Sequence, residues 1–375
     1  MLRSLSLFWL ANAIAQENPM PRRRLPLSPL LLSLLLPACM PQTPLSPEGD
    51  DLTPAARLGS PLRPQASETP DRLRPPSCTQ PDGCPVNVPV TKPVVYRFWG
   101  SSANSVWAVG KAGLTMHWNG VSWRRFGNAA TGDLWAVWGS AANDIWAVGD
   151  NATILHWDGS AWSKTTGLST TAGFNDVWGT SASDAWTVGD SGAIWRWDGS
   201  KWAQLVIPFV NGFMAVYGAT TNDVWVGGEA GLLLHWDGTK MNEVPTGSFD
   251  SIWRIRGSSI SNVYLTTEPS GGVSPLQRWD GSRWSAVVPA GSATVLGPEL
   301  WVIDNTRAWS ATTFGFLSPN PRGESYYWNG MAWTSKSPPL LGVVTAIWAT
   351  ATEGWISSAS GNLARYNGTS WVKTW

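Results

Sequence analysis

The three histidines of the chain, His117, His156 and His235, are the first candidates for metal or acid–base chemistry. Each stands directly before a tryptophan, at the same place in a pattern that the sequence repeats. Residues at one position of successive repeats are held apart by the repeat, so these three cannot converge on one metal ion. We predict instead that each one stacks or hydrogen-bonds locally. The equivalent residues of the other repeats are Arg196, Arg278, Tyr327 and Arg365.

Acidic residues recur with the same regularity. Asp158, Asp198, Asp237 and Asp280 each precede a glycine, and such Asp-Gly pairs are typical of tight turns. A second set lies just after a Val-Gly or Gly-Gly pair and consists of Asp150, Asp190 and Glu229. Oxygen ligands in tight turns suit calcium, but Lys111 replaces the acid in the first repeat, which favours a role in the turn. We predict no metal site and no cofactor.

Composition and motifs exclude several functions. Lys+Arg and Asp+Glu both number 26, so the formal net charge is zero. A chain with no basic excess is a poor candidate for binding nucleic acid through its phosphates. The sequence shows no Ser-His-Asp order, no P-loop and no dinucleotide-binding motif. We therefore predict that the protein is not an enzyme and has no catalytic residues.

Three markers define the repeat from residue 94 to the end of the chain. The first, usually an aromatic before glycine, falls at Trp99, Trp138, Trp178, Tyr217, Arg256, Trp301 and Trp348. The second, an aromatic seven or eight residues on, falls at Trp107, Trp146, Trp186, Trp225, Tyr264, Trp309 and Trp355. The third is an (Asp/Asn)-Gly pair, and in each unit its glycine is followed three residues later by Trp123, Trp162, Trp202, Met241, Trp284, Trp333 or Trp371. The sequence therefore contains seven units.

Each unit reads as four short strands joined by turns. In the second unit the strands are expected at 134–138, 145–149, 153–157 and 161–165, with Asn-Asp, Gly-Asp and Asp-Gly between them. Four antiparallel strands in about 40 residues, repeated seven times, are typical of a β-propeller. The fold class is therefore all-β, with a seven-bladed propeller over residues 94–375; two separate sheet domains are the alternative.

The tryptophans and the ends of the repeat follow from this fold. Of the 28 tryptophans, all but Trp9 lie in the propeller region. Large flat side chains at repeated positions fill the wedge between blades, so we expect most of them in the inter-blade core. The first unit starts with its own first strand and the last ends with its own fourth. Closure of the ring needs no donated strand, although residues 86–90 could pair with an edge.

The N-terminus indicates export. Arg22, Arg23 and Arg24 precede a leucine-rich stretch, residues 25–36, that is short for a membrane span. It ends in Leu-Pro-Ala-Cys at Cys39, which resembles the lipobox of bacterial lipoproteins. The resemblance implies that Cys39 is lipidated and that the chain is then cleaved before it. Residues 1–39 are then an over-extended start plus a lipoprotein signal peptide that ends at the lipidated Cys39, with Met20 as the start. Met40 stands where an Asp would favour the inner membrane, so we expect the outer membrane. An ordinary secretory signal is the alternative.

A proline-rich segment follows at 40–93. It lacks apolar periodicity, and its prolines stiffen and extend it, so we expect a disordered tether. Cys78 and Cys84 lie close together within it. In an exported protein such a pair is expected to form a small disulfide loop.

The repeat units resemble a known family. VGDSGAIWRWDGSKW, residues 188–202, is similar to repeats of bacterial Asp-box (BNR) propellers, especially those of photosystem II assembly factors, and to WDG-rich propeller lipoproteins. The strict Asp-box differs in the residue before the aspartate, which is tryptophan here in four units. In its families the box folds a turn, so the resemblance implies the fold and not catalysis.

Two neighbouring units depart most from the repeat. The second marker and the third-marker glycine are 13 residues apart in five units, 17 in the fifth and 21 in the sixth. Both insertions are expected on the face that carries the blade-to-blade loops, where they could form a binding rim, although a tolerated surface insertion is the alternative. The candidate rim residues are Glu268, Phe314, Phe316, Arg322, Glu324, Tyr326 and Tyr327. Aromatics with a few charges suit the recognition of sugar or peptide.

A sialidase-like glycoside hydrolase shares the Asp-box propeller and needs an arginine cluster, a Tyr–Glu pair and an Asp acid. Glu324 with Tyr326 is the one suggestive pair, and no such motif surrounds the arginines outside the third-strand series, which are Arg97, Arg124, Arg125, Arg254, Arg256, Arg283, Arg307 and Arg322. We therefore expect a monomeric, lipid-anchored protein scaffold of the outer membrane. Its partner would be an envelope protein; the alternatives are a glycan-binding propeller and, below it, the hydrolase.

Overall fold

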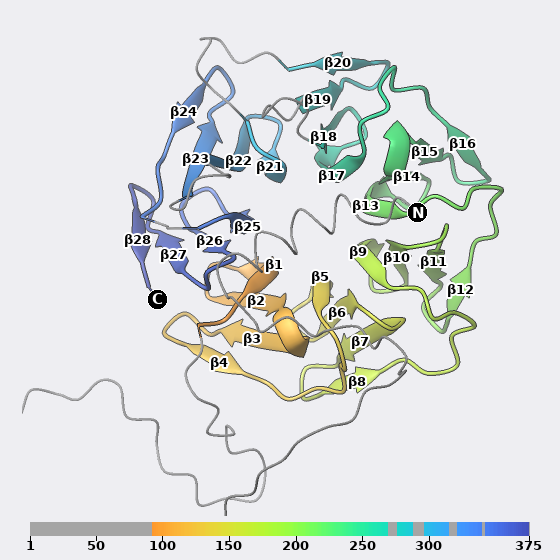
Figure 1. Cartoon of the computed structure of the whole chain (residues 1–375), viewed down its shortest axis with the longest axis horizontal. Helices are drawn as coiled ribbons and strands as arrows, with labels where there is room; N and C mark the ends of the chain where they lie inside the picture. Colours follow the sequence, from red (N-terminus) through yellow and green to blue (C-terminus); the bar gives the residue numbers. More distant parts are fainter. Residues whose placement is uncertain (1–91, 269–275, 288–295, 315–320, 340–341, 375) are drawn as a thin grey trace, which may run out of the picture. The chain divides into compact units, whose positions relative to one another are not determined.

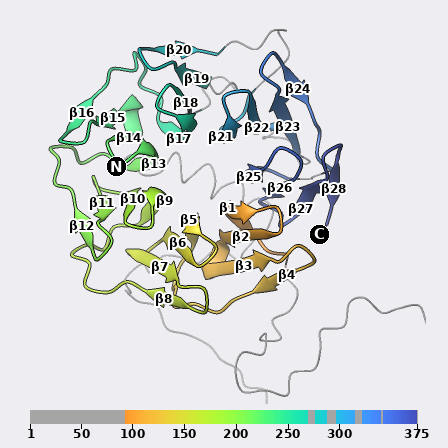
Figure 2. The same ribbon diagram turned by 180° about the vertical axis from the view of Figure 1, so that it is seen from behind.

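The computed structural model describes residues 92–268, 276–287, 296–314, 321–339 and 342–374. Within these residues the chain forms seven four-stranded antiparallel sheets, and both views show them arranged in a ring (Figure 1 and Figure 2). Each sheet consists of four consecutive strands, so each is one blade. The predicted seven-bladed β-propeller is confirmed.

The first strand of each blade lies innermost and packs on the first strands of the two neighbouring blades (Figure 1). These strands are β1 (Val95–Ser102), β5 (Leu134–Ala141), β9 (Phe174–Ser181), β13 (Phe213–Thr220), β17 (Ile252–Ser259), β21 (Glu299–Asp304) and β25 (Val344–Ala349). The second strands are β2 (Ser105–Gly110), β6 (Asp144–Gly149), β10 (Asp184–Gly189), β14 (Asp223–Gly228), β18 (Asn262–Thr267), β22 (Arg307–Phe314) and β26 (Gly354–Ser358). Two 3-10 turns, η1 (Lys111–Gly113) and η2 (Glu229–Gly231), follow β2 and β14.

The third strands end in an aromatic residue, and all fourth strands but one begin with tryptophan. The third strands are β3 (Leu114–Trp118), β7 (Thr153–Trp157), β11 (Ile194–Trp197), β15 (Leu233–Trp236), β19 (Leu276–Trp279), β23 (Arg322–Trp328) and β27 (Leu363–Tyr366). The fourth are β4 (Trp123–Arg125), β8 (Trp162–Lys164), β12 (Trp202–Gln204), β16 (Met241–Glu243), β20 (Trp284–Ala286), β24 (Trp333–Ser335) and β28 (Trp371–Lys373). Because each outer strand has three residues, the exposed sheet edges are short.

The strand boundaries of the second unit agree with the prediction within one residue except at the end of the first strand. β5 runs to Ala141 instead of ending at residue 138, because a register shift after Gly139 carries the pairing round the turn to Ala141 opposite Asp144. Only Ala142 and Asn143 remain between the strands. The sequence-based estimate ended the strand too early, at the Gly that follows Trp138.

The (Asp/Asn)-Gly turns between the third and fourth strands are built alike in all seven blades. Asp158 is representative: its Oδ1 accepts hydrogen bonds from the backbone N–H of Ser160 and Ala161, at 2.8 and 2.9 Å. Gly159 has φ of +98°, a left-handed conformation that glycine adopts without strain. These hydrogen bonds lower the pKa of Asp158 to about 2. The predicted turn-forming role of the repeated aspartates is confirmed.

The second-marker aromatics fill the interfaces between blades. Trp107 of blade 1 packs between Trp157 and Trp162 of blade 2, with ring centroids 4.8 and 5.1 Å apart. The same arrangement joins Trp146 to Trp197 and Trp202, Trp225 to Trp279 and Trp284, and Trp309 to Tyr366 and Trp371. Trp186 instead contacts Trp236, with Met241 at the fourth-strand position of the same core. The prediction that tryptophans form the inter-blade core is confirmed.

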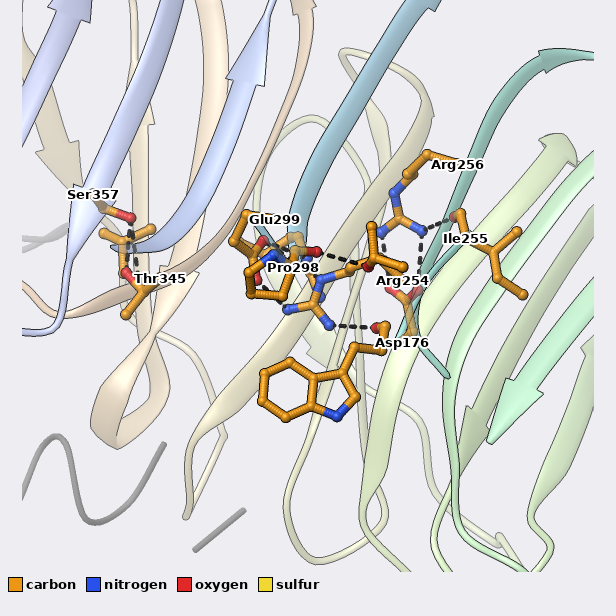
Figure 3. Close-up of polar contacts among 12 residues, drawn as sticks. Asp176, Arg254, Ile255, Arg256, Pro298, Glu299, Thr345 and Ser357 are labelled. Atoms are coloured by element: carbon orange, nitrogen blue, oxygen red, sulfur yellow. Dashed lines mark hydrogen bonds and ion pairs between the residues drawn. The ribbon is translucent and has the colours of Figure 1, made fainter. Parts of the chain in front are cut away.

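The ring closes between blade 7 and blade 1 without exchange of a strand. Trp355 packs on Trp118 and Trp123, at 5.0 and 4.8 Å, which repeats the interface found elsewhere. The hydroxyls of Thr345 and Ser357, drawn in Figure 3, both donate to the carbonyl of Val95. β1–β4 and β25–β28 are each complete sheets, as the sequence predicted.

The predictions for the N-terminus lie outside the described residues. They are the lipidated Cys39, the tether, the disulfide between Cys78 and Cys84, and the pairing of residues 86–90. Among the described residues, no helix is long and apolar enough to cross a bilayer.

Candidate functional site

Five charged side chains meet at the centre of the ring, and we call them the central charged cluster. Alternate residues of a strand point to the same face, so the first marker and the residue two before it share the inner face of each first strand. Blades 2, 4 and 7 carry an aromatic residue and an alanine there, and the other four blades carry at least one charged residue. These charged residues are Arg97 of β1, Asp176 of β9, Arg254 and Arg256 of β17, and Glu299 of β21.

Arg256 and Asp176 form the better satisfied half of the cluster (Figure 3). The two Nη atoms of Arg256 donate to the two carboxylate oxygens of Asp176, at 3.1 and 3.2 Å. Nη1 also donates to the carbonyls of Ile255 and Val216, and the guanidinium lies 5.1 Å from the ring of Trp178. Burial opposes ionisation of Asp176, but the charges of the three arginines outweigh it and hold its pKa below the ordinary value. A general acid needs the opposite shift.

Glu299 is shared by the other two arginines. Arg254 donates to it through Nη2 at 2.8 Å and through Nε at 3.4 Å, and its Nη1 donates to the carbonyl of Trp253. Arg97 reaches the same carboxylate with one contact of 3.5 Å, although only 6% of Arg97 is exposed. Burial, followed by the neighbouring charge of Arg254, lowers the pKa of Arg97 to about 9.

The strand-three residues that include the histidines act locally, as predicted. His156 stacks on Trp146 at 4.2 Å, and its Nε2 lies 2.6 Å from Asp144 Oδ1. His117 bonds Ser105 in the same way, and Arg196 and Arg278 bond Asp184 and Asn262. Each partner belongs to the second strand of the same blade. The three histidines themselves lie in β3, β7 and β15, which belong to three different blades. Among the described residues, no three His, Cys, Asp or Glu side chains are grouped to hold a metal ion.

The acidic residues after Val-Gly bond the chain around them. Asp150 accepts from the N–H of Asp133 at 3.0 Å and from the indole of Trp135 at 2.8 Å. Glu229 accepts from the N–H of Gly212 at 3.0 Å, and Asp190 from Asn175. Each one bonds the first strand of its own blade or the residue directly before that strand, which agrees with the predicted role in the turns.

The structure does not gather the candidate rim residues on one exposed surface. Tyr326 is 7% exposed and belongs to the hydrophobic core between blades 5 and 6. Tyr327 packs on Trp309, at the position that the histidines occupy in other blades. Arg322 is exposed, Glu268 is half-buried, and half-buried Glu324 accepts a 2.6 Å hydrogen bond from Ser337. Phe316 and the side chain of Phe314 are outside the described part of the chain.

The largest exposed apolar side chains of the described residues include a set that the sequence analysis missed. Val206 and Val210 lie between β12 and β13 and are 92% and 84% exposed, and Phe249, between β16 and β17, is 90% exposed. Both loops run from a fourth strand to the next first strand, so they lie on the same face of the ring, here called the loop face. We call these three residues the apolar rim. The signal was available in the sequence LVIPFV at 205–210, six consecutive residues without a polar side chain.

Other exposed large apolar residues are scattered. Val121 and Met331, each 84% exposed, follow the Asn-Gly pairs of blades 1 and 6, and Ile260 lies in the first hairpin of blade 5. These turns join first to second or third to fourth strands and therefore lie on the opposite face. Val372 is on the outer strand β28.

Comparison with solved structures identifies propellers of the same architecture. YCF48 bound to a D1 peptide gives a TM-score of 0.58 at 16% identity, over 74% of this chain and 94% of that one. YCF48 from Cyanidioschyzon merolae gives 0.56 at 17% identity, over 75% and 98%. A GH74 enzyme from Niastella koreensis gives 0.58 at 13% identity, over 75% of this chain and 53% of that one. No protein-family model matches the sequence. No curated protein matches it either. These likenesses establish the fold alone.

Proposed function

We propose that this protein is a non-enzymatic protein-interaction scaffold that binds an extended polypeptide across the loop face. The observation that carries the proposal is the apolar rim, formed by Val206, Val210 and Phe249, all at least 84% exposed. These side chains are exposed to water. A partner that covers them therefore gains about 25 cal/mol of binding free energy for each Å² of apolar surface that it buries.

Position strengthens this interpretation. Single exposed apolar residues are normal on a protein surface, whereas neighbouring ones mark interaction sites. The apolar rim occupies two consecutive loops of one face, while Val121, Ile260 and Met331 belong to separate turns of the opposite face. A partner that bridges two adjacent blades can contact the whole rim.

Two features favour binding over catalysis. Asp176 is held ionised by arginines, so it is unsuited to donate a proton. Burial, followed by the charge of Glu324, raises the pKa of Tyr326, which is the reverse of what an activated Tyr nucleophile needs. The Tyr–Glu pair of the hydrolase alternative is therefore poorly suited to its role.

A peptide is favoured over a glycan as the ligand. YCF48, a propeller of similar fold, has been solved with a bound peptide. Both the protein-binding and the glycan-binding predictions relied on the aromatic rim of blades 5 and 6. Of its described tyrosines, Tyr326 is buried in the core between these blades, and half-buried Tyr327 packs on Trp309. A glycan-binding propeller stays as the alternative that the experiment must separate.

We also propose that the scaffold acts at the cell envelope, anchored to the outer membrane by lipid on Cys39. Several acyl chains give stable anchoring where one is marginal. The test is fractionation of cells that produce Cys39→Ser. The variant is expected to leave the membrane fraction; an unchanged distribution would contradict lipid anchoring.

The ligand class can be decided by screening the purified protein against a displayed library of extended peptides and against a glycan array, side by side. We expect selection of peptides with spaced apolar residues and no specific glycan signal. Phe249→Asp should abolish peptide selection, whereas Met331→Asp, equally exposed on the opposite face, should not. Specific glycan binding that persists in Phe249→Asp would overturn the proposal.

A further inference from the structure

The central charged cluster carries one more positive charge than negative. Among the described residues, Arg97, Arg254 and Arg256 pair with Asp176 and Glu299, and the other residues at these two positions of the first strands are neutral. Ion pairs at the centre therefore leave one guanidinium charge without a counter-charge. A buried charge in this condition is costly unless another group compensates it.

Of the three arginines of the cluster, Arg97 has the fewest hydrogen-bond partners. Arg256 makes four side-chain hydrogen bonds, and Arg254 makes three. Arg97 has its single 3.5 Å contact with Glu299, and its buried Nε finds no hydrogen-bond acceptor in the described residues. A guanidinium offers five N–H donors, so most of the donor capacity of Arg97 is unused within the protein.

Among the described residues, the first strands that flank β1 offer Arg97 no acceptor side chain at the equivalent position. At the same position of the flanking first strands stand Ala136 of β5 and Ala346 of β25, both fully buried. Arg254, across the ring, keeps 17% of its side chain exposed, so the cluster is reached by solvent on that side. Glu299 already bonds Arg254 at 2.8 Å, which limits what it can give to Arg97.

We propose that the central charged cluster binds one carboxylate anion, held by Arg97 together with the exposed side of Arg254. A carboxylate matches the planar fork of a guanidinium through two parallel hydrogen bonds. A monovalent anion also balances the single excess charge, whereas doubly charged phosphate overcompensates it. The lowered pKa of Arg97 agrees with a charge that the protein alone does not satisfy. This site is separate from the apolar rim and does not depend on the proposed function.

The test replaces chloride by acetate stepwise, at constant ionic strength and neutral pH, in solutions of the full chain. Binding is followed by calorimetric titration and by the melting temperature. We expect saturable binding of acetate and a melting temperature that rises with it. Phosphate at the same ionic strength should have at least tenfold weaker affinity; equal affinity would overturn the carboxylate assignment.

Variants test the role of Arg97 directly. Arg97→Leu removes the excess charge and should weaken acetate binding at least tenfold, while Arg124→Leu, an exposed arginine of β4, should leave it unchanged. Unaltered acetate binding in Arg97→Leu would overturn the proposal. If Arg97→Leu fails to fold, Glu299→Gln serves instead. It raises the excess to two charges and should bind acetate more tightly than the wild type, and weaker or equal binding would contradict the site.

Discussion

The interfaces between blades and the centre of the ring use the repeat in opposite ways. At the interfaces, one aromatic residue of each second strand packs on the third and fourth strands of the next blade, from Trp107 on Trp157 to Trp355 on Trp118. At the centre, the same seven-fold repetition is broken by five charged residues that pair across the ring. The interfaces between blades are therefore alike in their residues, whereas the five charged residues at the centre differ from blade to blade.

The comparison separates residues that build the propeller from residues free to carry function. Where the same residue type stands in every unit, as in the (Asp/Asn)-Gly turns, its side chain forms contacts that the fold requires. Where one unit departs, as at Arg97 or in the apolar loop at Val206, the fold does not require the residue. The predictions below test this division.

The largest effect is expected at an interface. Trp225 is 1% exposed and packs on Trp279, Trp284 and His235. Trp225→Ala should lower the free energy of unfolding by about 5 kcal/mol, the upper end for large aromatic deletions, because a whole wedge is lost. Trp225→Tyr, which places the residue that blade 5 uses there, should cost less than half as much. Urea denaturation measures the free energy of unfolding of both variants. Equal losses would show that the aromatic ring between the blades does not account for the stability.

At the centre, removing both Asp176 and Arg256 is expected to cost less stability than removing Arg256 alone. Arg256→Met leaves Asp176 buried without its main counter-charge and should cost about 3 kcal/mol. The double variant Asp176→Leu with Arg256→Met removes both charges. Its free energy of unfolding should lie within about 1 kcal/mol of the wild-type value. The same denaturation experiment decides this. Additive losses in the double variant would mean that Asp176 and Arg256 contribute to stability independently and not as a pair.

The turns should give a smaller effect that appears only in acid. Hydrogen bonds within the turns lower the pKa values of Asp158, Asp198 and Asp280 from 3.8 to about 2. A lowered carboxylate pKa gives stability that is present above pH 4 and is lost as pH falls toward 2. Because these side chains are fully exposed, solvent screens the effect.

The control for the turns comes from the chain itself. Asn119, Asn329 and Asn367 occupy the same turn position in blades 1, 6 and 7. Replacing the three aspartates by asparagine should keep the turns and reduce the fall in melting temperature between pH 4 and pH 2. If the melting temperature of the variant falls as much as that of the wild type, other carboxylates cause the acid sensitivity, and Asp176 is the first candidate.

Most of the fold could be predicted because repetition multiplies a weak local signal. One hairpin such as that of Asp158 is ambiguous, but seven aligned copies fix the strand order, the turns and the positions of the buried aromatics. The misplaced end of β5 shows the limit, since a register shift depends on pairing and not on the local sequence.

The centre and the rim could not be predicted in the same way. Arg97 and Glu299 are 202 residues apart and meet only because the ring closes. The sequence showed Arg256 in place of an aromatic and several arginines outside the repeated set, but nothing local indicates which carboxylate each one reaches. Tyr326 and Tyr327 were assigned to a surface because their unit carries an insertion. Their repeat positions instead place Tyr326 in the core between blades 5 and 6 and half-buried Tyr327 against Trp309.

The most direct test of the account compares two faces of one molecule. Val206→Asp, Val210→Asp and Phe249→Asp are combined in one variant, and Val121→Asp and Met331→Asp in another. Since all five side chains are at least 84% exposed, each substitution should change the free energy of unfolding by about 0.5 kcal/mol or less. We predict that the loop-face variant loses binding of the selected peptide at least a hundredfold while the opposite-face variant keeps it. Equal binding by both folded variants would contradict the loop face as the interaction surface.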